Sequence, residues 1–80
     1  MVSTIQVTIG NSSPTPLFTG NVTSTKVVVT GSPVYIGNSS VSTSSGYPTD
    51  QPTEVVLERG ETLYGISPNN NTHVYLLVIE

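Results

Sequence analysis

Short runs of β-branched residues, each ended by glycine, proline or asparagine, are the feature that most limits how this chain can fold. Ile5, Val7 and Ile9 alternate with threonine and glutamine before Gly10, which is the period of a half-buried strand. Twelve valines and twelve threonines favour the pleated geometry of strands, and the absence of alanine argues against helices. The sequence therefore predicts an all-β protein.

Five further segments carry strand patterns, and turn residues separate them. They are Thr25–Thr30, Val34–Gly37, Glu54–Glu58, Thr62–Ile66 and His73–Ile79. Residues 39–45 are expected to form either a polar loop or a short edge strand. Eighty residues suffice for one core only. We therefore expect a single domain over residues 1–80, folded as a compact β-sandwich or a partly open β-barrel of six to eight short strands.

Residues 11–24 interrupt this pattern and are expected to form a flexible or extended segment. Proline cannot donate to a strand ladder, so Pro14 and Pro16 argue against regular pairing here. Leu17 and Phe18 are expected to anchor the segment. Either Phe18 covers one end of the chain's own core, or the segment reaches a neighbouring subunit.

The strands Glu54–Glu58 and Thr62–Ile66 are separated by a very short connection. Arg59 and Gly60 form its centre, and glycine can adopt the positive φ that a tight turn requires. This arrangement predicts a β-hairpin.

The last strand, His73–Ile79, is apolar on both faces. Tyr75, Leu77 and Ile79 share one face, and Val74, Leu76 and Val78 share the other. Such a strand either lies in the middle of a sandwich or presents one face to another subunit.

A chain of this size has few means of stabilising itself. It has no cysteine for disulfides and no set of residues suited to bind a metal, so no cofactor is expected. Association is the remaining way to cover more apolar surface. We therefore expect a homo-oligomer or a subunit that binds a larger surface.

The residue inventory does not favour catalysis, and we predict that the protein is not an enzyme. His73 is the only histidine, and it begins a strand after an asparagine turn, where side chains are ordinarily exposed. Glu54, Glu58 and Glu61 flank the predicted hairpin, where charges commonly solvate a strand edge. Asp50 is the only aspartate, which is too few for a calcium site.

Nucleic-acid and membrane partners are not expected either. Lys26 and Arg59 are the only basic residues, and the formal net charge is −3. The start of the chain lacks the pattern of a signal peptide, and no apolar run is long enough to cross a bilayer. We therefore expect synthesis in a host cytoplasm.

Three short motifs follow one another in the middle of the chain. They are Val34-Tyr35-Ile36-Gly37, Gly46-Tyr47-Pro48 and Leu63-Tyr64-Gly65-Ile66. Their order resembles that of small β-structured proteins of tailed-phage particles, over about two fifths of the chain. Residues 49–52 depart from the glycine-containing turn expected there. The resemblance implies a head-decoration (cement) or head-fibre protein, or a small domain of the tail or adsorption apparatus, and it brings no catalytic residue.

A decoration role implies a protein that binds the major capsid protein on the outer surface of the virion head, with a homotrimer as the expected assembly. The residues predicted to contact the capsid are Ile5, Val7, Ile9, Leu17 and Phe18. The residues predicted to mediate self-association are Val74, Leu76 and Val78.

A particle-borne module that binds a host-surface glycan or receptor is the alternative function. Polar and aromatic residues of the loop from Ser39 to Tyr47 would form its site, since Tyr47 is the one tyrosine outside the predicted strands. A bacterial structural module unrelated to virions is a third interpretation.

Overall fold

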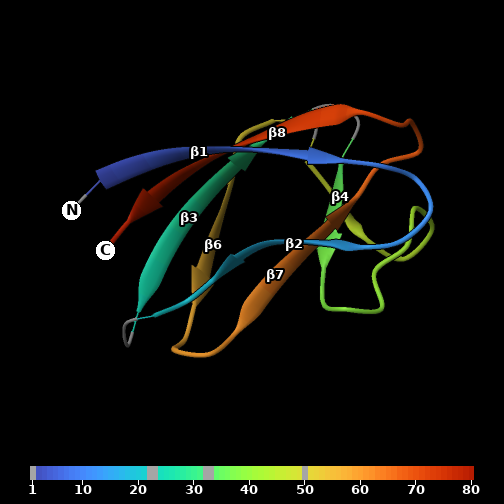
Figure 1. Ribbon diagram of the computed structural model, residues 1–80. Helices are drawn as coiled ribbons and strands as arrows, with labels where there is room; N and C mark the ends of the chain where they lie inside the picture. The colour runs from blue at the N-terminus through green and yellow to red at the C-terminus, as the bar shows by residue number, and fades with distance from the viewer. Residues whose placement is uncertain (1, 22–23, 32–33, 50) are drawn as a thin grey trace.

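The protein is built from eight strands (Figure 1). The computed structural model describes residues 2–21, 24–31, 34–49 and 51–80. The strands are β1 (Val2–Ile9), β2 (Thr15–Thr19), β3 (Thr25–Thr30), β4 (Tyr35–Gly37), β5 (Tyr47–Pro48), β6 (Thr53–Leu57), β7 (Thr62–Ile66) and β8 (Thr72–Ile79). The predicted all-β fold is confirmed.

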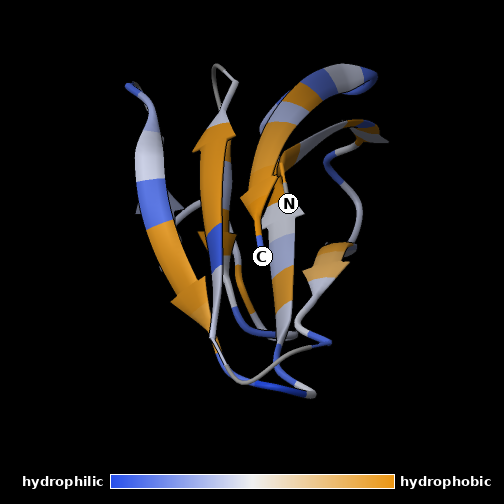
Figure 2. Ribbon diagram, turned by 90° about the vertical axis from the view of Figure 1, so that its left-hand side faces the viewer, coloured by the Kyte–Doolittle hydropathy of each residue, from blue (hydrophilic) through white to orange (hydrophobic). Residues whose placement is uncertain are grey.

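Two four-stranded antiparallel sheets pack face to face. Sheet A has the order β1-β8-β3-β6, and sheet B has the order β2-β7-β4-β5. The sheets remain separate and form no closed barrel, so the sandwich is the arrangement that the chain adopts. Figure 2 shows the hydrophobic colour concentrated on the strands and the hydrophilic colour in the connections. The two termini lie side by side in both views.

The strand order is that of one long hairpin rolled up on itself. Its pairs are β1–β8, β2–β7, β3–β6 and β4–β5, and residues 38–46 form its closed end. The pairs β3–β8 and β4–β7 form where the rolled hairpin meets itself. Every connection except that between β4 and β5 therefore passes from one sheet to the other. Eight strands joined in this way form a jelly roll.

The predicted hairpin of β6 and β7 is wrong, because these strands belong to different sheets. The turn between them does form: the Glu61 amide donates to the Glu58 carbonyl over 3.0 Å, and Gly60 has a φ of 87°. The turn does not continue into a strand ladder, and its backbone hydrogen-bonds to Gly20 instead. The Gly60 amide donates to the Gly20 carbonyl over 2.8 Å, and the Gly20 amide donates to the Glu61 carbonyl over 2.9 Å. Since the apolar faces of both strands point into one core, packing them across the sandwich buries more surface than pairing them side by side.

The segment predicted to lack regular pairing contains β2. Its partner is β7, and the register shifts between Pro16 and Phe18, so that the ladder passes over Leu17. A proline is compatible with this position because β2 is an edge strand. Of the predicted segment 11–24, Val22 and Thr23 lie outside the described residues.

The core lies between the two sheets. Its buried hydrophobic members are Ile9, Leu17, Val27, Val29, Val34, Ile36, Leu57, Leu63, Val74, Leu76 and Val78. Among the buried polar residues, Thr49 donates from its hydroxyl to the Val34 carbonyl at 3.1 Å, and Ser67 Oγ lies 2.8 Å from Thr72 Oγ1. The Thr25 hydroxyl is buried and has no hydrogen-bond partner.

The three motifs of the middle region lie in or beside sheet B. They contribute β4, β5 and β7, with Val34 buried just before β4. The closed end of the hairpin is compact, because a Cβ at Gly46 would lie 2.5 Å from the Cβ of Tyr35 and 2.8 Å from Cγ2 of Val41. Glycine at this position allows Val41 to be buried beneath the loop.

Candidate functional site: the outer face of sheet A

The alternation of β8 gives this strand one face inside the sandwich and one face outside. Val74, Leu76 and Val78 point into the core and are at most 1% exposed. The prediction that these three residues mediate self-association is therefore wrong, since none of them can reach a second molecule. Their neighbours Tyr75, Leu77 and Ile79 occupy the opposite face, which is open to solvent.

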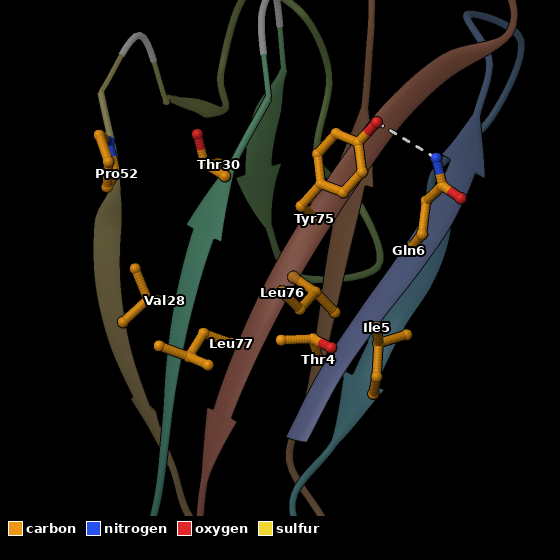
Figure 3. A pocket seen from close by; sticks show the side chains of 9 residues that line it. All are labelled: Thr4, Ile5, Gln6, Val28, Thr30, Pro52, Tyr75, Leu76 and Leu77. Carbon is orange, nitrogen blue, oxygen red and sulfur yellow. Dashed lines mark hydrogen bonds between the residues drawn. The ribbon is translucent and has the colours of Figure 1, made fainter. Parts of the chain in front are cut away.

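The strand registers place the outward side chains of sheet A in rows. The rows, read from β1 to β6, are Val2–Ile79–Lys26–Val56, Thr4–Leu77–Val28–Glu54 and Gln6–Tyr75–Thr30. Figure 3 shows part of this grid, with Val28, Leu77 and Thr4 following one another across three strands. Pro52 lies beside Thr30 at the start of β6 and continues the third row.

Most of the exposed apolar bulk of the chain gathers on this grid. Five large hydrophobic residues are exposed among those that the structure describes, and four of them belong to it: Val2 at 62%, Val56 at 52%, Tyr75 at 50% and Ile79 at 36%. The half-buried side chains of Leu77 and Val28 lie between them. We refer to the set Val2, Val28, Val56, Tyr75, Leu77 and Ile79 as the apolar face.

Polar groups border the apolar face. The Gln6 amide donates to the Tyr75 hydroxyl over 3.3 Å, as Figure 3 shows. Lys26 Nζ lies 3.8 Å from Glu54 Oε2, with both side chains about half exposed. An exposed pair of this kind adds at most about 1 kcal/mol to stability, but it leaves the face without net charge. Lys26 stands between Ile79 and Val56 in its row, so polar groups lie within the apolar face as well as at its margin.

The apolar face is hollowed next to Tyr75. An open depression of about 450 Å³ extends over β1, β8 and β3, and its lining includes Thr4, Val28 and Leu77 (Figure 3). A side chain of a partner molecule could therefore enter the face as well as lie on it.

The five residues predicted to contact the capsid fall into two groups by burial. Ile9 and Leu17 are core residues, at 2% and 6% exposure, and so cannot touch a partner. Ile5, Val7 and Phe18 are half-buried and pack against the margin of the core. Ile5 and Val7 belong to β1 and Phe18 belongs to β2, and these strands are edge strands of different sheets.

A second surface surrounds Tyr47, which is 63% exposed. An open hollow of about 480 Å³ lies beside it, between β4, β5 and β6, with Ile36, Val55 and Leu63 in its lining. Next to this hollow, a smaller polar depression is lined in part by Asn38, Ser40 and Ser45. The predicted loop thus places one exposed aromatic ring close to several hydroxyl and amide groups.

Reactive groups do not converge on any of these surfaces. The Thr8 hydroxyl lies 3.2 Å from His73 Nδ1, but no other side chain hydrogen-bonds to this imidazole in the described ranges. A nucleophile and base of this kind would need a third group to orient the ring. Nowhere in the part of the chain that the structure covers do three or more His, Cys, Asp or Glu side chains gather as metal ligands. Asp50 lies outside the described residues.

No family model, curated protein or solved structure matches this chain. The described ranges contain no helix long and apolar enough to cross a membrane.

The sequence separated the two faces of β8, but it did not predict that Val28 would lie beside the outer face of β8 or that Val56 would lie one strand further along the sheet. The alternation in Thr25–Thr30 and Thr53–Leu57 carried the necessary signal, because Val28 and Val56 fall on the polar side of these strands. An apolar residue on a polar side marks a position that could meet a partner.

Proposed function

We propose that this protein is a phage head-decoration (cement) subunit that binds the major capsid protein on the outer surface of the shell through its apolar face. The observation that carries the proposal is the concentration of exposed Val2, Val56, Tyr75 and Ile79 on one face of sheet A. The choice of a phage shell as the larger surface comes from the resemblance of the middle motifs, which implies this class of protein.

The dimensions of the apolar face suit a small docking site. With strands about 4.8 Å apart and same-face residues about 7 Å apart along a strand, the whole outer grid of four strands and three rows covers about 400 Å². The residues of the apolar face occupy about half of this grid, and polar residues of the grid lie among them. One partner of a standard interface contributes about 800 Å², so each subunit alone would bind weakly and many copies would coat a lattice together.

A decoration protein needs no reactive group. Its binding surface must instead be rigid. The apolar face meets this requirement, because its residues stand on paired strands of one sheet and not on loops.

Co-sedimentation with emptied, expanded heads of the encoding phage tests the proposal. The wild-type protein should pellet with the heads at a saturable ratio and stay in the supernatant without them. Leu77→Asp should remain in the supernatant in both cases, whereas Tyr47→Ala, changed on the opposite sheet, should pellet like the wild type. Equal pelleting of Leu77→Asp and the wild type would remove the apolar face from the proposal.

Binding of a host-surface glycan or receptor is the second candidate, and the exposure of Tyr47 beside a polar depression favours it. An exposed aromatic ring next to hydroxyl and amide groups is a common arrangement for recognising polar ligands. In this case the protein should adsorb to host cells and block infection, and Tyr47→Ala should abolish both effects while Leu77→Asp leaves them unchanged. The same two variants thus separate the two functions.

A further inference from the structure

The four edge strands of the sandwich differ in how they are protected against pairing with another chain. Strand β2 carries Pro16 and a bulge, and β5 has only two residues, one of which is Pro48. Strand β6 is preceded by Pro52 and presents Glu54 in its middle. Prolines, bulges, charges and short length are the devices by which proteins prevent edge-to-edge association.

Strand β1 has none of these devices. It runs for eight residues, Val2–Ile9, without a proline or a charged side chain. Its register with β8 is continuous from Val2 to Ile9, so no bulge bends the edge away. On its other side none of the described strands pairs with it, and alternate residues of such a strand direct their N–H and C=O groups outward.

The core is also incompletely covered at this edge. Ile5 and Val7 point inward but remain half-buried, whereas Val74 and Leu76 on the neighbouring strand are at most 1% exposed. A further strand placed beside β1 would cover Ile5 and Val7. It would also form hydrogen bonds with the outward N–H and C=O groups of β1.

We propose that β1 pairs antiparallel with β1 of a second copy of this chain, about a twofold axis, so that the two A sheets become one continuous eight-stranded sheet. This inference does not depend on the proposed function. The occupant is a second copy because β1 complements itself: it is uncharged, so two copies meet without repulsion, and its faces alternate regularly. A contact in which the same surface serves both partners closes at two subunits, not three.

The alternation of β1 restricts the register. Directly opposed residues of antiparallel strands project on the same face, so odd-numbered residues must oppose odd-numbered ones if both cores are to stay buried. Of the registers that satisfy this rule, the two that pair the greatest length of Val2–Ile9 place Ile5 opposite either Ile5 or Val7 of the second copy. Both registers join the half-buried margins of the two cores, and both leave Thr4 and Gln6 on the outer face close to their counterparts.

If the proposed docking role holds, dimerisation also enlarges the docking surface. The outer faces of two A sheets side by side, polar residues included, would cover about 800 Å², which is the share of one partner in a standard interface. A dimer would therefore bind a shell through a surface of ordinary size.

Sedimentation of the purified chain over a range of concentrations tests the inference. A concentration-dependent dimer is expected. Thr4→Lys/Gln6→Lys should raise the dissociation constant at least about tenfold, because it places lysines opposite each other in either register. The control Thr30→Lys/Gln51→Lys adds the same charges away from β1, at the end of β3 and just before β6, and should dimerise like the wild type. A monomer at every concentration, a trimer, or a dimer insensitive to Thr4→Lys/Gln6→Lys would overturn the inference.

Hydrogen exchange of the wild-type protein provides a test that requires no variant. Alternate amides of residues 2–9 face outward, so they should exchange rapidly in dilute solution and more slowly as the dimer forms. Amides of the other edge strands, β2, β5 and β6, should not change. Concentration-dependent protection on β6 in place of β1 would contradict the proposal even if the double variant failed to fold. Neither measurement involves heads, so a negative result here leaves the proposed docking role untouched.

Discussion

The two faces of β8 have almost the same apolar character but different environments. Val74, Leu76 and Val78 are enclosed between the sheets, whereas Tyr75 and Ile79 on the same strand are exposed by 50% and 36%. Hydropathy alone therefore does not distinguish the apolar residues that form the core from the apolar residues that lie on the surface. The pairing of the chain makes the distinction, because it determines which face of sheet A meets sheet B.

The largest difference in stability between variants of the two faces of β8 is expected when a charged side chain is introduced. Leu76→Asp removes a core side chain and leaves a carboxylate unpaired in the interior, each at a cost of several kcal/mol. An 80-residue domain is stabilised by only about 4–12 kcal/mol, so this variant should be unfolded at 25 °C. Leu77→Asp on the outer face should cost about 1–2 kcal/mol and remain folded. Circular dichroism would measure both, and a folded Leu76→Asp would contradict the assigned core.

Alanine gives a graded version of the same comparison. Leu76→Ala should lower the free energy of unfolding by about 2–5 kcal/mol, because a cavity forms between the sheets. Leu77→Ala should lower it by less than about 1 kcal/mol, since the half-exposed side chain leaves no enclosed cavity. Urea unfolding of both variants measures the difference. Equal losses would show that the outer face is already covered in solution, as in a tight oligomer built on that face.

Gly60 lies in the turn between β6 and β7 and belongs to neither face of β8. A substitution there tests the effect of backbone conformation on stability, separately from side-chain packing. A Cβ at this residue would meet no atom within 4 Å, and its φ of 87° disfavours any β-branched side chain. Gly60→Val should therefore cost about 1–3 kcal/mol without any change in packing. Thermal unfolding is the measurement, and an unchanged melting temperature would mean that the turn between the sheets is misplaced.

The smallest effect is a gain in stability inside the sandwich. The Thr25 hydroxyl is buried without a partner, so Thr25→Val replaces an unsatisfied group by a methyl of similar size. The free energy of unfolding should rise by about 1 kcal/mol. Thr30→Val on the outer face of the same strand is the matched control and should change it by less than about 0.5 kcal/mol. A loss of stability in Thr25→Val would indicate that this hydroxyl has a partner.

Most strands could be predicted from the sequence because each carries its own alternation. Residues 25–30 and 62–66 match the predicted bounds, and the period alone separated the two faces of β8 without showing which one turns inward. Strand β2 was missed because prolines usually exclude pairing, whereas an edge strand with a bulge tolerates one. The self-association residues were misassigned for a different reason: both faces of β8 are apolar, and the sequence contains no local signal for which one turns inward.

The sequence could not predict which strands belong to which sheet, because most strand pairs of a jelly roll join segments that are distant in the sequence. The connection at Gly60 looks like a hairpin turn locally, yet the chain crosses to the other sheet there. By contrast, the glycine of the middle motif has a local reason: the tight approach of Tyr35 to Gly46 excludes any side chain at that position. The first two motifs thus flank the closed end of the hairpin, the third forms most of β7, and the candidate binding face lies on the other sheet.

The central claim is that the outer face of β8 binds a partner and is not needed for folding. The most direct test compares Leu77→Asp with the wild type by co-sedimentation on emptied heads, with the melting temperature of each protein measured in parallel. Leu77→Asp should be folded and should no longer pellet with heads. A folded variant that pellets as the wild type does would contradict the central claim.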